Sequence, residues 1–318
     1  MKLPRVSICI PTYCQIDFLR ETLRSVKEQD FQDYELIIFD DTPDDSVAQL
    51  VASFDFDDRL YYQHNAVSLG SPANWNAAVR HAKGDYIKLL HHDDKFSCPE
   101  ALGRFVGLLD EHPESDFAFS ASSAQNITLS KNYQHCPNQA QVAKIIEVPE
   151  TLFLSNIIGA PSATIYRNGL TIEYDSQLQW LVDIDFYIRI LSINSHLIYT
   201  PEVLIDTTTD ADHQITERCK NNVAIEMFEY LYVYQKIAPK ISGDLNTQSV
   251  WFRLFEKYQI YALTDLKQQG IELPPSLEEM LLPFFIAYRQ IWLKRTPYRI
   301  YTHLPESLKC AIRFLFTR

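Results

Sequence analysis

The chain has 318 residues, 46% of them hydrophobic, so it is long enough to bury one large core or two ordinary ones. Its net charge of −12 argues against nucleic-acid binding, which requires a basic surface. Six scattered cysteines without a CxxC pair, and no apolar window long enough to span a bilayer, favour a protein of the reducing cytoplasm. We expect no secretion signal, disulfide framework or zinc site.

The first third of the chain alternates short apolar runs with segments of helical periodicity. Strands are predicted at 5–10, 34–39, 59–63 and 85–90, and helices from Asp17 onward, at 46–53 and at 72–82. This alternation predicts right-handed crossovers and a mostly parallel sheet with helices on both faces. A helix at 99–111 and strands near 116–120 and 123–128 extend the pattern.

The pattern weakens beyond Tyr133. Residues 132–141 are polar and predict a loop, followed by a helix at 150–156, a strand at 162–166 and a helix at 183–193. From about residue 212 onward the pattern is mostly helical. We therefore expect an α/β domain over 1–215, with halves 1–130 and 131–215, and a helical C-terminal region over 216–318.

The C-terminal segment 284–318 is both basic and apolar. It holds seven Lys or Arg and one acidic residue, so its net charge is +6 while the rest of the chain carries −18. This composition is typical of a segment that docks on an anionic membrane surface. It is equally compatible with a terminal helix that packs on the acidic body.

Two of the predicted strands end in adjacent carboxylates. Asp40 and Asp41 follow the apolar run 34–39, and Asp93 and Asp94 follow the run that ends in Leu89 and Leu90. The carboxyl ends of parallel strands meet at one edge of a sheet, where open α/β folds bind ligands. Because carboxylates are the preferred ligands of hard divalent cations, the pattern predicts a site for a metal-bound polyphosphate.

Four segments in the right order resemble family 2 of the inverting glycosyltransferases, of the type that assembles bacterial glycans. They are the first strand and turn at 6–13, the strand 34–41, Gly70 with Asn76, and the approach to the metal motif at 82–87. The resemblance covers about the first 95 residues and implies a GT-A fold, a Rossmann-like sheet flanked by helices.

The resemblance implies a metal site at the second acidic pair. Asp94 would bind Mn²⁺ or Mg²⁺ directly, and Asp93 would contact the sugar or the ribose. His92 stands where the family usually has the first Asp of Asp-x-Asp. His213 resembles a late family histidine that approaches the metal or the diphosphate. The alternative is that the two aspartates only cap the following helix.

The resemblance places the nucleotide at the ends of the first two strands. Asp41 would accept a hydrogen bond from the ring N–H of a uracil-like or thymine-like base, a donor that cytosine lacks. Tyr13 would stack on the base, Thr12 and Pro11 would line the same wall, and Asn76 would support the pocket. The alternative is that 40–45 is a solvated turn, since its composition also suits one.

A later acidic segment, 180–189, resembles the family motif of Glu-Asp followed six residues on by Arg. Val182 replaces the Glu, while Asp183 and Arg189 match. Asp183 would be the general base that takes the acceptor hydroxyl proton, a role typically worth about 10²–10⁴ in rate. The competing interpretation is that Asp183 caps the helix that it begins.

Together these features predict a metal-dependent inverting glycosyltransferase. It would move one sugar from a UDP- or dTDP-sugar to a hydroxyl of a glycan, lipid-linked and at the cytoplasmic membrane face. The Gln-x-x-Arg-Trp signature of processive synthases is absent from the sequence. Two alternatives stay open at this point, a sugar-phosphate nucleotidyltransferase and a non-catalytic glycan-binding protein.

Overall fold

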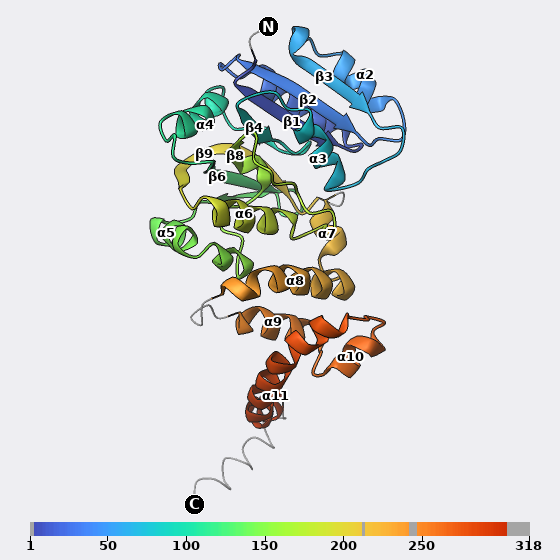
Figure 1. Cartoon of the computed structure of the whole chain (residues 1–318). Helices are drawn as coiled ribbons and strands as arrows, with labels where there is room; N and C mark the ends of the chain where they lie inside the picture. Colours follow the sequence, from blue (N-terminus) through green and yellow to red (C-terminus); the bar gives the residue numbers. More distant parts are fainter. Residues whose placement is uncertain (1–2, 212–213, 242–246, 304–318) are drawn as a thin grey trace, which may run out of the picture. The chain divides into compact units, whose positions relative to one another are not determined.

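A computed structural model describes residues 3–211, 214–241 and 247–303 of the chain (Figure 1). Its contacts divide the chain into two compact units, Met1–Ile241 and Ser242–Arg318. Helix α8 (Val223–Ile237) therefore belongs to the first unit, 22 residues beyond the end that the sequence suggested for the α/β domain at residue 215. The functional division into donor and acceptor halves stays a prediction.

The N-terminal half of unit 1 is a parallel sheet with the order β3-β2-β1-β4. Its strands and helices follow the predicted alternation closely, although α1 starts from Gln15, and Asp17 lies inside the first turn rather than at the cap. The elements are β1 (Val6–Thr12), α1 (Ile16–Lys27), β2 (Tyr34–Asp40), α2 (Ser46–Ala52), β3 (Leu60–His64), α3 (Ala73–Arg80) and β4 (Tyr86–Leu89).

The second half of the sheet is mixed, with the order β4-β8-β6-β9-β5 and with β7 paired to β6. Strand β8 is antiparallel to both β4 and β6, so the sheet is parallel mainly in its N-terminal half. The remaining elements of unit 1 are β5 (Lys95–Phe96), α4 (Ala101–Asp110), β6 (Phe117–Asn126), β7 (Lys131–His135), α5 (Gln139–Glu147), β8 (Thr164–Arg167), α6 (Val182–Ile193), β9 (Leu197–Thr209) and α7 (Ile215–Cys219). The predicted α/β class, with a helical C-terminal region, is confirmed.

Two strands of this half differ from the sequence prediction. The two short strands expected at 116–120 and 123–128 are one strand, β6, and its parallel partner β9 was not predicted at all. Strand β9 carries Pro201 in its middle, and the pairing slips there, from Ser120 opposite Thr200 to Ala121 opposite Val203. A proline and a bulge within the strand remove the alternation by which strands are recognised.

The predicted loop 132–141 was also wrong. Residues 131–135 form β7, whose side chains are mostly exposed, and α5 starts after a capping box between Asn138 and Gln141. The helix predicted at 150–156 is a 3₁₀ turn, Pro149–Phe153. Here pairing with β6 and reciprocal capping outweigh the weak local apolar pattern.

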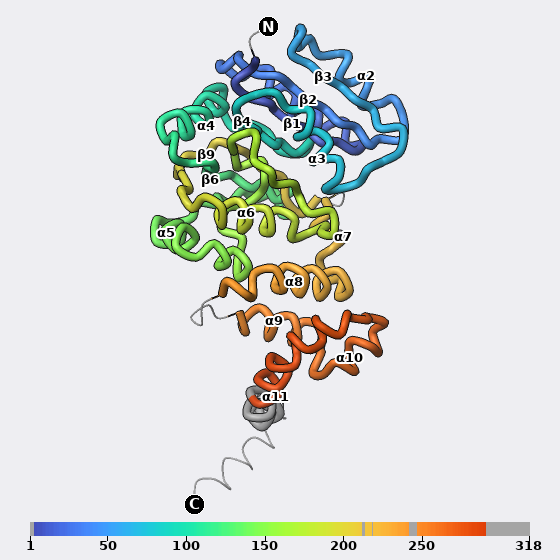
Figure 2. Tube along the Cα trace, viewed as in Figure 1, coloured from blue at the N-terminus to red at the C-terminus, as the bar shows by residue number. Residues whose placement is uncertain are grey.

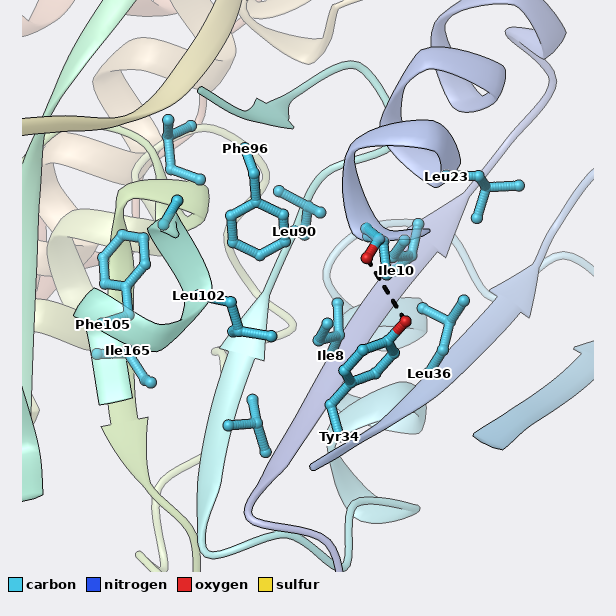
Figure 3. Close-up of a cluster of buried hydrophobic side chains, with 14 of the residues drawn as sticks. Ile8, Ile10, Leu23, Tyr34, Leu36, Leu90, Phe96, Leu102, Phe105 and Ile165 are labelled. Carbon is cyan, nitrogen blue, oxygen red and sulfur yellow. Dashed lines mark hydrogen bonds between the residues drawn. The ribbon is translucent and has the colours of Figure 1, made fainter. Parts of the chain in front are cut away.

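A buried apolar cluster lies between the parallel strands and the helices α1 and α4 (Figure 3). Ile8 and Ile10 of β1 contact this cluster together with Leu23 of α1, and Leu102 and Phe105 of α4 close its other side. Each fully buried side chain of this kind stabilises the fold by about 1.5–3 kcal/mol. The cluster fixes the strands whose carboxyl ends carry the acidic pairs.

The second unit contains α9 (Gln248–Tyr258), α10 (Leu263–Gln268) and α11 (Pro275–His303). Phe285 of α11 stacks on Phe255 of α9 with ring centroids 4.3 Å apart, and Tyr288 contacts the same ring at 5.5 Å. The start of the basic segment 284–318 therefore packs on a helix. Among the described helices none is sufficiently long and apolar to cross a bilayer.

Candidate functional site

The two acidic pairs lie at the same edge of the parallel sheet, as predicted. Asp40 ends β2 and Asp41 follows it, while Asp93 and Asp94 follow β4. Strand β1 pairs with both strands and lies between them. The backbone N–H of Asp41 donates to the Thr12 carbonyl at 3.0 Å, which joins the ends of β1 and β2. The topology thus concentrates carboxylates at the carboxyl edge of the sheet.

Asp41 is enclosed by the loop that precedes α3. Its Oδ1 accepts hydrogen bonds from Asn65 Nδ2 at 2.8 Å and from the Leu69 N–H at 2.9 Å, and its Oδ2 accepts one from the Gly70 N–H at 2.8 Å. Gly70 has φ +70°, a conformation that favours glycine. Asp41 is only 6% exposed, so the solvated-turn alternative is wrong for this residue, although residues 43–45 of the same segment are exposed. Its Oδ2 retains capacity for a further donor.

The end of β1 presents one exposed ring beside buried polar groups. Pro11 and Thr12 are buried, whereas 47% of Tyr13 is exposed. The buried hydroxyls of Thr12 and Ser71 have no hydrogen-bond partner among the described residues. Unpartnered buried hydroxyls are costly in a closed core. They are suited to a place where a polar ligand completes their bonding.

Asn76, which the sequence predicts to support the nucleotide pocket, forms hydrogen bonds with the backbone of Tyr174. Its amide donates to the Tyr174 carbonyl at 2.8 Å and accepts from the Tyr174 N–H at 2.9 Å. Its neighbour Asn74 contacts the Asp41 network instead, because its Oδ1 accepts from Asn65 Nδ2 at 3.0 Å. Asn76 thus anchors the segment around Tyr174 to α3, and a contact of Asn76 with a nucleotide stays a prediction.

The second acidic pair forms a cluster with a histidine. Ligand atoms of His91, Asp93 and Asp94 all lie within 4.8 Å of one another. Helix α4 begins only at Ala101, so the alternative that the aspartates cap it is wrong. The histidine in the cluster is His91 rather than His92, whose Nδ1 instead lies 3.4 Å from the Pro11 carbonyl oxygen.

The protonation states of this cluster suit a cation. Burial lowers the pKa of His91 to about 4, which keeps its imidazole neutral and able to ligate, and its buried Nε2 has no hydrogen-bond partner among the described residues. Burial, together with the charge of Asp93, raises the pKa of Asp94 well above its usual range. A divalent cation would relieve this repulsion. Two carboxylates and one imidazole fit Mn²⁺ better than Mg²⁺, which prefers oxygen ligands throughout.

Residues far along the chain hold the cluster in place. Thr208 of β9 donates its N–H to Asp94 Oδ1 at 3.2 Å, and Gln214 Nε2 donates to Asp93 Oδ2 at 3.0 Å. The His91 N–H donates to Ser162 Oγ at 2.9 Å. The predicted metal residue His213 precedes Gln214 but lies outside the described residues. This support comes from β9, from the N-cap of α7 and from the segment before β8, and none of these is adjacent to the cluster in sequence.

Lys88 of β4 is completely buried beneath the cluster. Its Nζ donates to the Thr164 carbonyl at 3.1 Å and also to the Ser162 carbonyl. Burial lowers the pKa of Lys88 to about 7, an effect that the charge of Asp94 opposes. Lys88 therefore ties β4 to the segment that carries Ser162.

Asp183 lies in the first turn of α6 and is partly accessible. Its Oδ2 accepts a hydrogen bond from Asn156 Nδ2 at 2.7 Å, and its Oδ1 accepts from the Ile184 N–H at 2.8 Å. Burial raises the pKa of Asp183 to about 7, and the hydrogen bonds reduce this effect. A carboxyl group that titrates near neutral pH is suited to general base catalysis.

A chain of aromatic contacts connects α6 to the acidic cluster. Trp75 of α3 contacts the His91 ring at 4.6 Å and the Tyr174 ring at 5.2 Å. Tyr174 in turn stacks on Phe186 of α6 at 4.3 Å. Asp183 lies in the first turn of α6. This helix therefore contacts the histidine of the cluster indirectly, through the rings of Tyr174 and Trp75.

The supporting residues could not be found from the sequence. Asn156, Ser162 and Gln214 are ordinary polar residues without a motif, and their partners lie 27 to 121 positions away. His91 was visible beside the acidic pair, but nothing in the sequence distinguished it from His92. Which of these two histidines joins the cluster depends on which imidazole ring points toward Asp94 in the folded chain.

The fold is a mixed α/β architecture with an acidic cluster at the carboxyl edge of its parallel strands. The sequence matches the family described as Glycosyl transferase family 2 over residues 7–171, more than half of the chain. The chain belongs to this family and is a glycosyltransferase. The nucleotidyltransferase and non-catalytic alternatives are therefore set aside.

The chain is also similar to curated proteins over most of its length. The chain is 27% identical to MT1568, an uncharacterized protein of Mycobacterium tuberculosis, over 63% of its own length and 66% of that protein. It is 25% identical to WcaA of Escherichia coli, a putative colanic acid biosynthesis glycosyl transferase, over 81% of the chain and 88% of WcaA.

Solved structures show the same fold. S. aureus TarS in complex with UDP-GlcNAc has a TM-score of 0.58 and 17% identity, over 94% of this chain and 83% of that one. The mannosyltransferase PcManGT from Pyrobaculum calidifontis, in complex with GDP-Man and Mn²⁺, has a TM-score of 0.54 and 16% identity, over 100% and 89%. At these identities the likeness establishes the architecture.

Proposed function

We propose that the protein is a metal-dependent, inverting transferase that moves one sugar from a UDP- or dTDP-sugar to a hydroxyl of a glycan. The observation that carries this proposal is the cluster of His91, Asp93 and Asp94 at the same sheet edge as Asp41. One edge thus offers a cation site and a recessed carboxylate, which are the two features that a nucleoside diphosphate requires.

Asp41 and Tyr13 are the groups that would recognise the base. The free capacity of Asp41 Oδ2 suits the ring N–H of uracil or thymine, and the exposed ring of Tyr13 suits stacking. Thr12 and Pro11 line the wall between them. The UDP-GlcNAc bound to S. aureus TarS supports a nucleotide-sugar donor for this fold.

Asp94, Asp93 and His91 would hold Mn²⁺ or Mg²⁺, with His213 as a further candidate ligand. Such a cation, when bound, supplies Lewis-acid stabilisation of the charge on a leaving diphosphate. Thr208, Gln214 and Ser162 orient the ligands, as outer-shell partners do in metal sites. The mixed nitrogen and oxygen set supports Mn²⁺ as the preferred ion.

Asp183 is the proposed general base. Its carboxylate would accept the proton of the acceptor hydroxyl while that oxygen attacks the anomeric carbon from the face opposite the diphosphate. The new carbon–oxygen bond forms as the bond to the phosphate oxygen breaks, so the nucleoside diphosphate leaves with the electron pair and the configuration inverts. Its pKa of about 7 supports this role, because the group is ionised in part at neutral pH yet basic enough to take the proton.

The acceptor is proposed to be a lipid-linked glycan at the inner face of the cell membrane. WcaA, which is named for colanic acid biosynthesis, supports a role in polysaccharide assembly. The net charge of +6 over 284–318 supports contact with anionic lipids. This contact would leave the protein cytoplasmic and peripheral to the membrane.

A thermal-shift panel tests the donor and the metal together. We expect UDP or dTDP with Mn²⁺ to raise the melting temperature, and GDP and CDP to leave it unchanged. A subsequent panel of UDP- and dTDP-sugars would identify the sugar from release of the diphosphate. Equal stabilisation by all four nucleotides, or stabilisation that ignores Mn²⁺, would overturn the proposed donor site.

A further inference from the structure

Helices α6 and α8 are both labelled in Figure 2. A buried carboxylate from α8 closes the turn that leads into α6. Glu229 is 1% exposed, and its Oε1 accepts the Gln179 N–H at 2.8 Å. Its Oε2 accepts the Trp180 N–H at 3.0 Å and the Leu181 N–H at 2.8 Å. All of these groups are backbone donors, so the Glu229 carboxyl group accepts from three successive N–H groups. Burial raises the pKa of Glu229, and these three hydrogen bonds oppose that rise.

This turn directly precedes Asp183. Leu181 is the N-cap of α6, so the last N–H that Glu229 binds is two positions before the proposed base. The first turn of the same helix is also braced from α8, because Lys236 Nζ lies 2.8 Å from Asp185 Oδ1. Helix α8 therefore fixes the beginning of α6 at two points, although it lies beyond the residues that match the family.

We propose that Glu229 is a positioning residue for Asp183, which it holds toward the acceptor by fixing the turn 179–181. The inference rests on the proposed role of Asp183 as the general base. It assigns a part in the reaction to α8, which the sequence suggested only as a helix of the C-terminal region.

Glu229 also influences the charge on Asp183. The ionisable groups that face Asp183 are Tyr187 on its own helix, Tyr174 from the preceding segment and Glu229 from α8. Asp185 lies on the same first turn but is paired with Arg189 and Lys236. Burial is the main reason that the pKa of Asp183 is raised, and the ionised form of Glu229 raises it further.

The first experiment measures the pKa of Asp183 without any substrate. The protein is labelled with [¹³Cγ]aspartate, and the resonance that disappears in Asp183→Asn is followed against pH. In Glu229→Gln we expect the titration midpoint to move to lower pH, because a negative charge is lost. In Glu229→Asp the charge remains, so the midpoint should stay near the wild-type value. A midpoint that is unchanged in Glu229→Gln would overturn the electrostatic part of the inference.

The second experiment measures turnover as UDP release from UDP-N-acetylglucosamine, UDP-glucose and UDP-galactose with Mn²⁺. Glu229→Gln and Glu229→Asp should both lower kcat about tenfold or more, because the base is displaced, and leave the affinity for UDP with Mn²⁺ unchanged. Only in Glu229→Gln should the acidic limb of the rate profile move to lower pH. Should Glu229→Gln fail to fold, Glu229→Asp still tests positioning.

Glu226→Gln is the matched control. Glu226 lies one turn earlier on α8, is 2% exposed and accepts a backbone N–H, from Asn221 at 3.0 Å, but not in the turn before α6. Its kcat and pH profile should equal those of the wild type. Equal losses in both variants would mean that α8 acts only through general stability, which would overturn the inference.

The two proposals fail in different ways. An active Asp183→Asn variant would refute the base assignment itself. An inactive Asp183→Asn variant combined with wild-type kcat in Glu229→Gln would refute the positioning role alone.

Discussion

The amide of Asn156 lies 2.7 Å from Oδ2 of Asp183 and fixes the direction of that carboxylate. The same amide is held in turn by Gly159, whose N–H donates to Asn156 Oδ1 at 2.9 Å. The proposed base is thus oriented by a segment 27 positions earlier in the chain. Ser162, which is three residues after Gly159, accepts a hydrogen bond from the His91 N–H. One short segment therefore supports both the base and the metal cluster.

Substitution of Asp94 should remove metal-dependent nucleotide binding. Asp94→Asn takes away the most buried carboxylate of the cluster, so the affinity for UDP in the presence of Mn²⁺ should fall more than the ~10- to 100-fold that is typical of outer-shell substitutions. Isothermal titration calorimetry measures this directly. Asp58→Asn, at an exposed position, is the control and should bind as the wild type does. Unchanged calorimetry in Asp94→Asn would count against the metal role.

Substitution of His91 should change metal preference. The wild type should bind Mn²⁺ more tightly than Mg²⁺, and His91→Asn should weaken Mn²⁺ binding ~10-fold or more with a smaller effect on Mg²⁺, because only the nitrogen ligand is lost. Water-proton relaxation enhancement reports bound Mn²⁺. His112→Asn, on the surface after α4, serves as the control. If the ratio of the two affinities stays constant in His91→Asn, the imidazole is not a ligand.

Substitution of Asp183 should remove transfer and spare donor binding. Asp183→Asn cannot accept a proton, so kcat should fall about 10²–10⁴-fold while the Kd for UDP with Mn²⁺ stays constant. In the wild type the rate should rise about tenfold per pH unit below pH 7 and level off above it, because the pKa of Asp183 is about 7. A rate that is flat between pH 5.5 and 8 would contradict the assignment.

The same pKa predicts a change of stability with pH. In the unfolded chain Asp183 ionises near its usual value of ~4, whereas in the folded protein its pKa is about 7. The folded state thus binds more protons in this window, and the contribution of Asp183 to folding falls as pH rises from ~4 to ~7. The melting temperature of Asp183→Asn minus that of the wild type should therefore be more positive at pH 8 than at pH 5. Circular dichroism melts compare the two differences, and equal differences would show that the carboxyl group is not perturbed.

Membrane contact by 284–318 should depend on its charge. Replacement of Lys294, Arg295 and Arg299 by Gln should reduce co-sedimentation with vesicles of phosphatidylglycerol roughly 100-fold, because each basic residue contributes about 1 kcal/mol near an anionic surface. Substitution is preferable to truncation here, since Phe285 packs on Phe255. Lys83→Gln with Lys131→Gln and Lys144→Gln provides a control with equal charge loss. Binding that survives in the tail variant would place the contact elsewhere.

The sequence determined the parallel half of the fold and the acidic edge. Runs such as 34–39 and 85–90 are mostly apolar because both faces of a parallel strand are buried, and this pattern can be recognised in the sequence without knowledge of the neighbouring strands. Carboxylates at the ends of two such strands must meet at one edge, since parallel strands share a direction. Asp41, Asp93 and Asp94 were accessible to sequence reasoning for that reason alone.

Tertiary structure decided everything that depends on partners distant in the chain. Strand β9 is interrupted by Pro201, and its pairing with β6 and β5 makes it a strand. The choice of His91 over His92, the commitment of Asn76 to Tyr174, and the binding of Glu229 at the start of α6 all depend on which way a side chain turns in the folded chain. Local patterns encode burial along one element, whereas hydrogen-bond partners are set by packing between elements, and the sequence of neither partner carries that information by itself.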